Sequence, residues 1–384
     1  MHDDITGIAT SNHRGDRRRF GIKREDRFLH TYVIGKTGTG KSTLLGNMAA
    51  QDLATGNGLV LIDPHGDLVD RLHQDALHVG RKDVIYLNAT DPNQPYGYNP
   101  LRHVRADRIP LAASGLLEVF KKMWSDAWGV RMEHILRNAL YALLEQKDAT
   151  LSDIPRLFRD QTYRKRIAAS LQNEPVRIFW EKEFERYSFA YRADGIASIQ
   201  NKIGAFLADP VMRRILTAPK EPISLRRIMD EGKVLLVNLG KGKIGEDSSA
   251  LLGGLLVTTI GLAAYSRADT LPDARRDFFA YIDEFQSFTT LAVANMLSEL
   301  RKYRVGLTMA HQYLFQLEPE IRHAVLGNAG TLISFRLGAE DAGYISREFD
   351  GRFEVGDLLN LKNHHIYLKL MIDGQPSKPF SATT

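Results

Sequence analysis

The residues most specific for chemistry are 35–42, which read Gly-Lys-Thr-Gly-Thr-Gly-Lys-Ser. They match the phosphate-binding pattern G-x-x-x-x-G-K-[ST], whose glycines allow backbone N–H groups to surround a triphosphate. In that pattern Lys41 neutralises charge on the β- and γ-phosphates, and the hydroxyl of Ser42 ligates Mg²⁺. The pattern therefore predicts ATP and Mg²⁺ as cofactors. The residues expected to bind them are Gly35, Lys36, Thr37, Gly38, Thr39, Gly40, Lys41, Ser42 and Thr43.

Two carboxylates form the second candidate group. Asp283 and Glu284 directly follow the apolar run Phe278–Ile282, which is expected to be a strand. Beside a phosphate-binding loop, the first carboxylate should hold Mg²⁺ and the second should polarise the water that attacks the γ-phosphate. We therefore assign Ser42 and Asp283 to the metal, and Lys41 and Glu284 to catalysis.

A third candidate is Gln312, which follows the apolar run 305–310. An amide at the end of a strand next to the nucleotide can contact the γ-phosphate and respond to its loss. A glutamine that caps a surface strand would give the same sequence. We expect the catalytic role, and the alternative remains open at this point.

These side chains must be positioned by a sheet, because each follows an apolar run of strand length. Strands alternate with helices along much of the chain, which predicts an α/β fold with a mostly parallel central sheet. A further strand between the loop strand and the Asp283 strand favours the RecA-like (ASCE) P-loop NTPases, in which a glutamate activates water. The expected strands are Thr31–Ile34, 58–62, 83–87, 233–239, Phe278–Ile282, 305–310, 331–335 and 365–371.

The strand signals are interrupted by one long helical region. Residues 105–231 show helical periodicity with scattered prolines and almost no strand pattern, which predicts an inserted all-helical subdomain. Residues 31–104 and 232–384 then form the RecA-like ATPase core. Residues 1–30 are rich in arginine and are expected to be a basic, solvated N-terminal arm.

Composition narrows the function classes. The chain has 384 residues, a net charge of +5 and no cysteine, so disulfides and thiolate metal sites are excluded. The N-terminus lacks the apolar region of a signal peptide. The longest apolar stretch, 250–265, is shorter than a membrane span and reads as a buried helix. We therefore expect no intrinsic membrane span and a cytoplasmic location, which allows a peripheral position at the inner membrane.

Several short stretches together resemble one group of motor proteins. The group comprises the HerA/FtsK-like RecA-fold DNA translocases, and the similarity is greatest to the VirD4/TraG/TraD-like coupling proteins of conjugative type IV secretion. The resemblance implies a ring, usually a hexamer, that threads DNA and binds ATP between subunits. The matching stretches are 33–43, 61–68, 96–101, 238–246, 281–285, 300–307, 310–312 and 328–331.

The resemblance also suggests roles for residues outside the loop. Arg301 occupies the place where such motors carry an arginine that reaches into the neighbour's site, and Arg304 is the alternative. Residues 63–67, which read Asp-Pro-His-Gly-Asp, should have a supporting role near the nucleotide or the subunit interface, or form a purely structural turn. Lys241 and Lys243 on a glycine-rich loop could contact DNA phosphates without sequence preference.

Three functions remain open on these motifs. The first is a DNA-translocating ATPase that works with relaxase, nuclease or secretion partners. The second is a VirB4-like secretion or assembly ATPase that acts on protein. The third, a nucleotide-gated binding module, is disfavoured by the intact Asp283-Glu284 pair. Membrane-bound coupling proteins begin with transmembrane helices that this sequence does not show, so the sequence is either that of a soluble relative or part of a longer, membrane-anchored protein.

Overall fold

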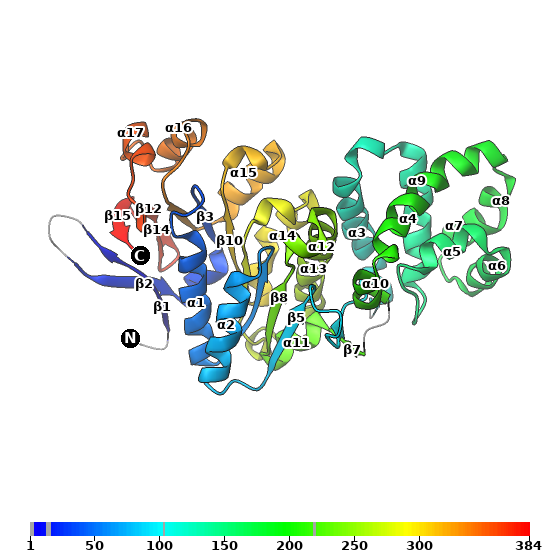
Figure 1. Cartoon of the computed structure of the whole chain (residues 1–384), viewed down its shortest axis with the longest axis horizontal. Helices are drawn as coiled ribbons and strands as arrows, with labels where there is room; N and C mark the ends of the chain where they lie inside the picture. The colour runs from blue at the N-terminus through cyan, green and yellow to red at the C-terminus, as the bar shows by residue number, and fades with distance from the viewer. Residues whose placement is uncertain (1–3, 13–16, 103, 218–219) are drawn as a thin grey trace.

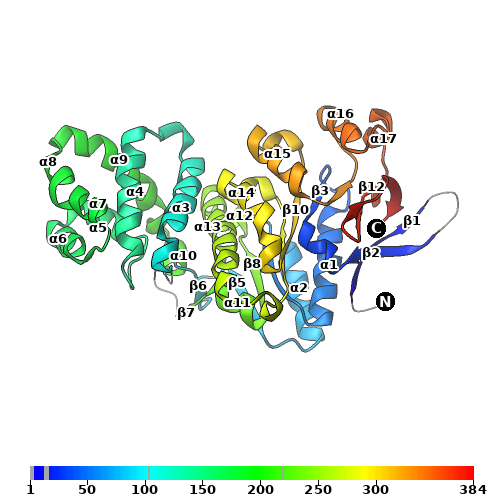
Figure 2. The same ribbon diagram turned by 180° about the vertical axis from the view of Figure 1, so that it is seen from behind.

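The fold is described from a computed structural model of the chain, in which all residues except 1–3, 13–16, 103 and 218–219 are described, together with all side chains except those of 189–194. Figure 1 shows a broad α/β core and, beside it, a separate group of helices made by the middle of the chain. Figure 2 shows the same arrangement from behind.

The core is built on an eleven-stranded sheet with the order β2-β1-β15-β12-β11-β3-β10-β9-β4-β8-β5. The strands from β11 to β5 in this order are parallel, and the remaining four strands are antiparallel to their neighbours. This agrees with the predicted α/β fold and mostly parallel sheet. The strands are β1 (Ile5–Ser11), β2 (Arg19–Lys23), β3 (Thr31–Ile34), β4 (Gly58–Asp63), β5 (Val84–Asn88), β8 (Val234–Asn238), β9 (Phe278–Ile282), β10 (Val305–His311), β11 (Thr331–Ser334), β12 (His365–Lys369) and β15 (Phe380–Thr383).

Helices cover both faces of the sheet, which explains why the central strands β3, β4, β8, β9 and β10 are buried along their whole length. One face packs against α1 and α2, and the other packs against α3, α11, α13, α14 and α15. The helices of the core are α1 (Lys41–Thr55), α2 (Asp67–His78), α3 (Ile109–Met123), α11 (Leu225–Glu231), α12 (Lys241–Ile244), α13 (Glu246–Ser266), α14 (Leu291–Leu300), α15 (Pro319–Asn328), α16 (Ala339–Glu348) and α17 (Val355–Leu359).

The helical insert is reached through α3. This helix packs on α13 of the core and on α4 of the insert, so it belongs to both units. On the return path α11 packs against α13 and β4. The structure therefore attaches both ends of the expected segment 105–231 to the core. The helices of the insert are α4 (Val130–Leu144), α5 (Asp153–Arg159), α6 (Gln161–Ser170), α7 (Glu174–Ile178), α8 (Phe184–Arg186), α9 (Phe189–Ala208) and α10 (Pro210–Thr217).

Residues 1–30 differ from the expected solvated arm. Their described part includes β1 and β2, which extend the main sheet: β1 pairs with the C-terminal strand β15, and β2 pairs with β1 (Figure 1). Arg27 is buried and makes two 2.7 Å ion-pair contacts with Asp52 of α1. Its guanidinium also lies 3.4 Å from the centre of the Phe279 ring. The arginines of this segment suggested a solvated arm because sequence alone does not reveal a buried partner.

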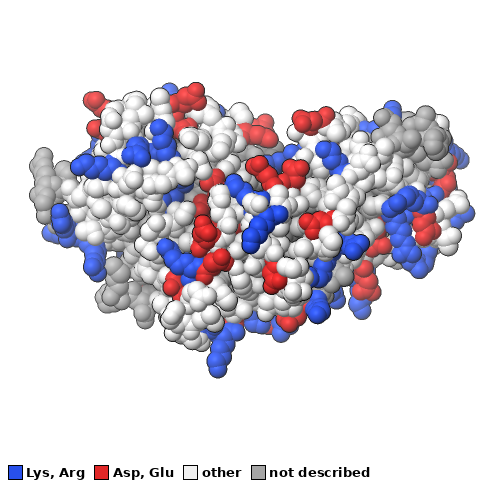
Figure 3. Space-filling view, in the orientation of Figure 1, with Lys and Arg blue, Asp and Glu red and all other residues white. Residues whose placement is uncertain are grey.

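The apolar stretch 250–265 lies in α13, as expected. Among the described residues, one helical segment, Glu246–Asp269, is long and apolar enough to cross a membrane, and 72% of its most apolar window is buried in the fold. Gly253 allows this packing, because a side chain there would approach the ring of Phe288 to 2.3 Å. On the face shown in Figure 3, acidic and basic side chains are interspersed over the core, and basic side chains gather over the helical insert.

Candidate nucleotide site

The phosphate-binding loop connects β3 to α1, as the sequence predicted. Lys41 begins α1, and its buried Nζ donates hydrogen bonds to the carbonyl oxygens of Gly35 at 2.6 Å and Lys36 at 3.2 Å. Burial lowers the pKa of Lys41, while the nearby carboxylates of Asp283 and Glu284 oppose that shift. The lysine is thus held at the mouth of the loop, near two carboxylates.

The glycines of the loop are required by its shape. Gly40 has a φ of +120°, and a side chain there would lie 3.0 Å from Nδ1 of His364. Gly38 has a φ of +73°, another conformation that L-residues rarely adopt. In the described part of the chain, the backbone N–H groups of Gly38, Gly40 and Ser42 have no protein acceptor. Such free N–H groups at a helix N-terminus fit the oxygens of a phosphate chain.

Ser42 and Asp283 come together at the end of the loop. The Ser42 hydroxyl donates a 2.8 Å hydrogen bond to Oδ2 of Asp283, while Oδ1 accepts the backbone N–H of Glu284 at 3.0 Å. Burial raises the pKa of Asp283, and the bond from Ser42 opposes that shift. A hydroxyl and a carboxylate are oxygen ligands of the kind that Mg²⁺ prefers. Among the described residues, no group of three or more His, Cys, Asp or Glu side chains is arranged to hold a metal ion.

Glu284 is held by two glutamines. Nε2 of Gln312 donates to Oε1 of Glu284 at 2.8 Å, and Nε2 of Gln286 donates to Oε2 at 2.6 Å. Glu284 also has a φ of +50°, which is unusual for a residue with a side chain and costs about 1–3 kcal/mol. The structure therefore brings Gln312 to the carboxylate of Glu284.

A buried histidine lies behind these residues. His311 ends β10, contacts the hydroxyl of Tyr32 through Nε2, and leaves Nδ1 without a partner among the described atoms. Burial, reinforced by the charge of Lys41, lowers the pKa of His311 to about 3. A neutral imidazole beside the lysine avoids placing two positive charges in the same buried region.

The Asp-Pro-His-Gly-Asp stretch forms a turn at the same edge of the sheet. Asp63 is buried, and its carboxylate accepts the N–H groups of His65 at 2.8 Å and Leu68 at 2.9 Å. Asp63 thereby fixes the start of α2. Its charge also contributes to the raised pKa of Asp283, so the turn lies close to the candidate metal site. The structure therefore shows the turn, and a supporting role near the nucleotide stays a prediction.

Arg301 lies far from the loop of its own chain. It precedes β10, whereas Gln312 follows that strand, so the two residues lie at opposite edges of the sheet. The Arg301 side chain is exposed. The alternative, Arg304, is engaged by Asp277 at 2.6 Å and Glu25 at 2.8 Å. Of the two arginines, Arg301 is the one available to another subunit.

The candidate DNA-contacting lysines lie on α12, after the carboxyl end of β8. Lys243 is exposed and Lys241 is half-buried. The backbone N–H of Lys241 donates to the carbonyl of Pro64 at 2.8 Å, which places this loop beside the Asp63 turn. Of the aromatic residues in the insert, Trp124 is buried and stacks on Phe120 with ring centres 4.7 Å apart, so it is a core residue.

Three residues to which the sequence assigned no role at the nucleotide site touch it. Gln286 holds Glu284, as described above. The backbone N–H of His364 donates to the Thr39 carbonyl at 2.9 Å, so the C-terminal part of the chain supports the loop. Lys122, at the end of α3, donates to the backbone of the segment that follows Glu284. None of the three belongs to a motif, and only the fold brings them there.

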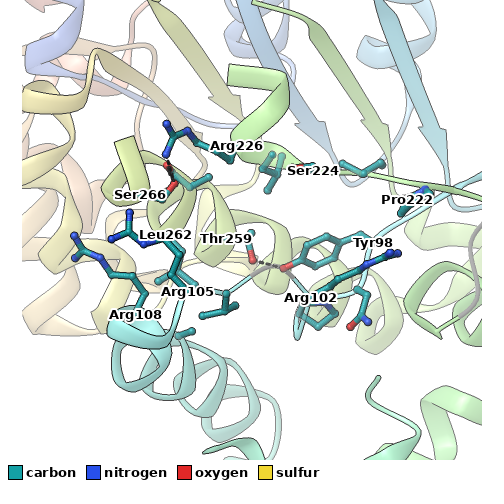
Figure 4. Close-up of a pocket in the computed structure, with 17 residues that line it drawn as sticks. Tyr98, Arg102, Arg105, Arg108, Pro222, Ser224, Arg226, Thr259, Leu262 and Ser266 are labelled. Atoms are coloured by element: carbon teal, nitrogen blue, oxygen red, sulfur yellow. Dashed lines mark hydrogen bonds between the residues drawn. The ribbon is translucent and has the colours of Figure 1, made fainter. Parts of the chain in front are cut away.

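A pocket of about 250 Å³ lies elsewhere, between the two connections that join the insert to the core (Figure 4). Its wall includes Tyr98, whose hydroxyl meets Thr259 of α13, and Ser224 at the start of α11. No residue of the phosphate-binding loop lines it. The pocket is separate from the candidate nucleotide site.

Comparisons with solved structures agree with this fold. The chain resembles the plasmid coupling protein TrwB in complex with the non-hydrolysable GTP analogue GDPNP, with 17% identity, a TM-score of 0.67, and coverage of 95% of this chain and 87% of that one. TrwB in complex with ADP and Mg²⁺ matches with 16% identity, a TM-score of 0.66 and the same coverage. VirB4 of Thermoanaerobacter pseudethanolicus matches with 13% identity and a TM-score of 0.63, covering 98% of this chain and 96% of that one.

No curated protein matches the sequence. The family comparison is more specific: residues 20–360 match the sequence profile of the type IV secretion-system coupling protein DNA-binding domain. This match spans the phosphate-binding loop, the helical insert and the Asp283-Glu284 strand. On this evidence, the chain belongs to the family of type IV secretion-system coupling protein DNA-binding domains.

Proposed function

We propose that the chain is a Mg²⁺-dependent ATPase that assembles as a hexameric ring and moves DNA during conjugative transfer by type IV secretion. The observation that supports this most directly is the contact of Ser42 with Asp283, next to a Glu284 carboxylate held by two amides. The related TrwB structures contain ADPNP, or ADP with Mg²⁺. The residues of this chain fit the same ligands.

In this proposal the chain's own residues divide the work. The N–H groups of the loop and the Lys41 ammonium bind the phosphates, while Ser42 and Asp283 hold Mg²⁺, which supplies charge neutralisation at the phosphates when bound. Glu284 accepts a proton from the attacking water. Gln312, which holds Glu284 here, moves to the γ-phosphate and so links its presence to the position of the carboxylate.

Arg301 completes the site of a neighbouring subunit. Because it lies at the opposite edge of the sheet from its own loop, it can stabilise transition-state charge only in another copy of the chain. Lys241 and Lys243 face DNA phosphates in the ring. Contacts between these lysines and phosphates predict that DNA binding weakens as the salt concentration rises and does not depend on base sequence.

The proposal is tested by ATP turnover with and without DNA. We expect single- or double-stranded DNA to raise kcat at low salt, and Glu284→Gln to abolish turnover while ATP remains bound. Turnover by Glu284→Gln at the wild-type rate would refute the role of that residue. The mass of the assembly with an ATP analogue, measured by light scattering, tests the hexamer.

The ring is tested by mixing two inactive variants. Lys41→Ala lacks a functional loop but retains Arg301, and Arg301→Ala has the converse defect. If the arginine acts between subunits, mixed assemblies contain some complete sites and regain part of the wild-type activity. No gain on mixing, when mixed assemblies are shown to form, would refute the arrangement.

A second function is favoured by one observation. The VirB4 structure is covered over 96% of its length, with a TM-score close to those of the coupling proteins. The fold therefore also suits a secretion ATPase that acts on protein. ATP turnover that responds to neither form of DNA at low salt would favour this reading over DNA translocation.

A further inference from the structure

Lys122 connects the helical insert to the catalytic segment of the core. It lies in the last turn of α3, and its Nζ donates hydrogen bonds to the carbonyl oxygens of Gln286 at 2.5 Å and Thr289 at 2.7 Å. Neither carbonyl receives a backbone N–H from the described residues. A lysine at a helix end usually faces water or its own helix carbonyls. Here the Lys122 ammonium instead donates to backbone carbonyls of another segment.

The segment that Lys122 binds is the one that positions Glu284. Residues 285–289 form a tight turn in which Ser287 and Thr289 donate backbone hydrogen bonds to Glu284 and Phe285 at 2.9 Å and 3.1 Å. The side chain of Gln286, in the same turn, donates to the Glu284 carboxylate. Lys122 is therefore separated from the carboxylate by a single residue, Gln286, which it binds through the backbone.

The other end of this connection is the insert. The ring of Phe120, in α3, stacks on the ring of Trp124, which directly follows that helix. The helix α3 packs on α4 of the insert. Lys122 is half-buried among these elements, and the carboxylate of Glu318 is the acidic group that acts on it. A displacement of the insert that moved the end of α3 would thus act on the Gln286 and Thr289 carbonyls.

We propose that Lys122 is a positioning residue for ATP hydrolysis, which fixes the Gln286 turn and through it Glu284, so that the position of the helical insert sets the catalytic rate. This inference rests on the proposed ATPase function. It assigns no contact with nucleotide to Lys122, so nucleotide affinity should not depend on it. It also gives a physical route by which a partner bound to the insert can change turnover.

The test compares Lys122→Met with Lys121→Met, its exposed neighbour on the same helix. For Lys122→Met we expect kcat to fall at least tenfold while KM for ATP changes less than twofold. Lys121→Met should retain kcat within twofold of wild type. Lys122→Arg, which keeps a donor for both carbonyls, should recover part of the loss. Equal kcat values for the two methionine variants would overturn the proposal.

A second measurement does not depend on turnover. Hydrogen exchange in the full chain should become faster at the Ser287, Phe288 and Thr289 amides in Lys122→Met and remain unchanged in Lys121→Met. Unchanged exchange at this turn would overturn the proposal even if the protein hydrolyses no ATP. Conversely, absence of turnover in wild type combined with faster exchange in Lys122→Met would refute the proposed function and retain the positioning role. Thermal unfolding of each variant shows whether the folded fraction is the same.

Discussion

Replacing Gln312 with leucine tests how much catalysis depends on the fixed position of Glu284. Leucine keeps the size of the side chain and removes the 2.8 Å hydrogen bond to Oε1 of the carboxylate. A hydrogen bond to a charged group contributes about 1.5–3 kcal/mol. If all of it serves to orient the base, kcat falls by about 10- to 150-fold, since about 1.4 kcal/mol corresponds to a factor of ten.

Gln286 determines whether the full effect is seen. Its amide holds the other oxygen of Glu284 at 2.6 Å, so the carboxylate keeps one anchor in Gln312→Leu. We therefore expect the lower half of the range for each single variant. The double variant should lose more than the product of the two single effects if either amide suffices to orient the carboxylate, and less if both amides are needed together.

The assay is steady-state ATP turnover at saturating Mg²⁺, with ATP and ADP affinities measured on the same samples. Gln161→Leu, at the exposed start of α6, is the control for a glutamine that contacts no site residue. A kcat within twofold of wild type for Gln312→Leu would refute the positioning argument. A loss confined to the preference for ATP over ADP would show that Gln312 reads the γ-phosphate and does not orient the base.

Three further predictions concern the frame around the site. Arg27→Met should lower the free energy of unfolding by about 3–5 kcal/mol in urea titrations, because it leaves the buried carboxylate of Asp52 unpaired; a loss below 1 kcal/mol would contradict this. Gly40→Ala should weaken binding of a fluorescent ATP analogue at least tenfold, because its φ of +120° suits glycine; unchanged affinity would show that the loop can adapt. Burial lowers the pKa of His30 from 6.5 to about 4, so between these pH values the unfolded state binds more protons than the folded state. The free energy of unfolding should therefore fall as the pH drops below 6.5, by up to about 1.4 kcal/mol per pH unit. His30→Asn should reduce that slope in urea titrations, and an equal slope would contradict the assignment.

The sequence predicted the centre of the fold well because local patterns determine it. The apolar runs before Gly35 and Asp283 form β3 and β9. Because both strands are parallel to β10, which lies between them, Gly35 and Asp283 follow their strands at the same end of the sheet. Ser42 and Asp283, 241 positions apart, meet as the motif chemistry requires. Parallel strands buried on both faces give such a continuous apolar signal that their number and type could be inferred without a structure.

The two ends of the chain were not predicted, for a different physical reason. β1, β2 and β15 are short, half-buried strands, and the first two join the sheet through one long-range pairing, because β1 pairs with β15 across more than 350 residues and β2 pairs with β1. Arg27 looked like a solvent-exposed arginine because its partner, Asp52, is on α1. Likewise, nothing local distinguishes Lys122 from Lys121, although one supports the catalytic turn and the other faces solvent.

The same geometry explains why one subunit should not suffice for hydrolysis. β10 has seven residues, which at about 3.3 Å each separate its ends by roughly 23 Å. Arg301 stands before this strand and Gln312 after it, so no side-chain rotation brings the arginine to its own nucleotide. If catalysis needs a guanidinium from Arg301, that group must come from a second copy of the chain. In that copy the amino ends of the strands must face the carboxyl ends of the strands in this one. Each subunit then offers one end of its strands to each neighbour, a head-to-tail contact that gives the proposed ring when the rotation between subunits closes.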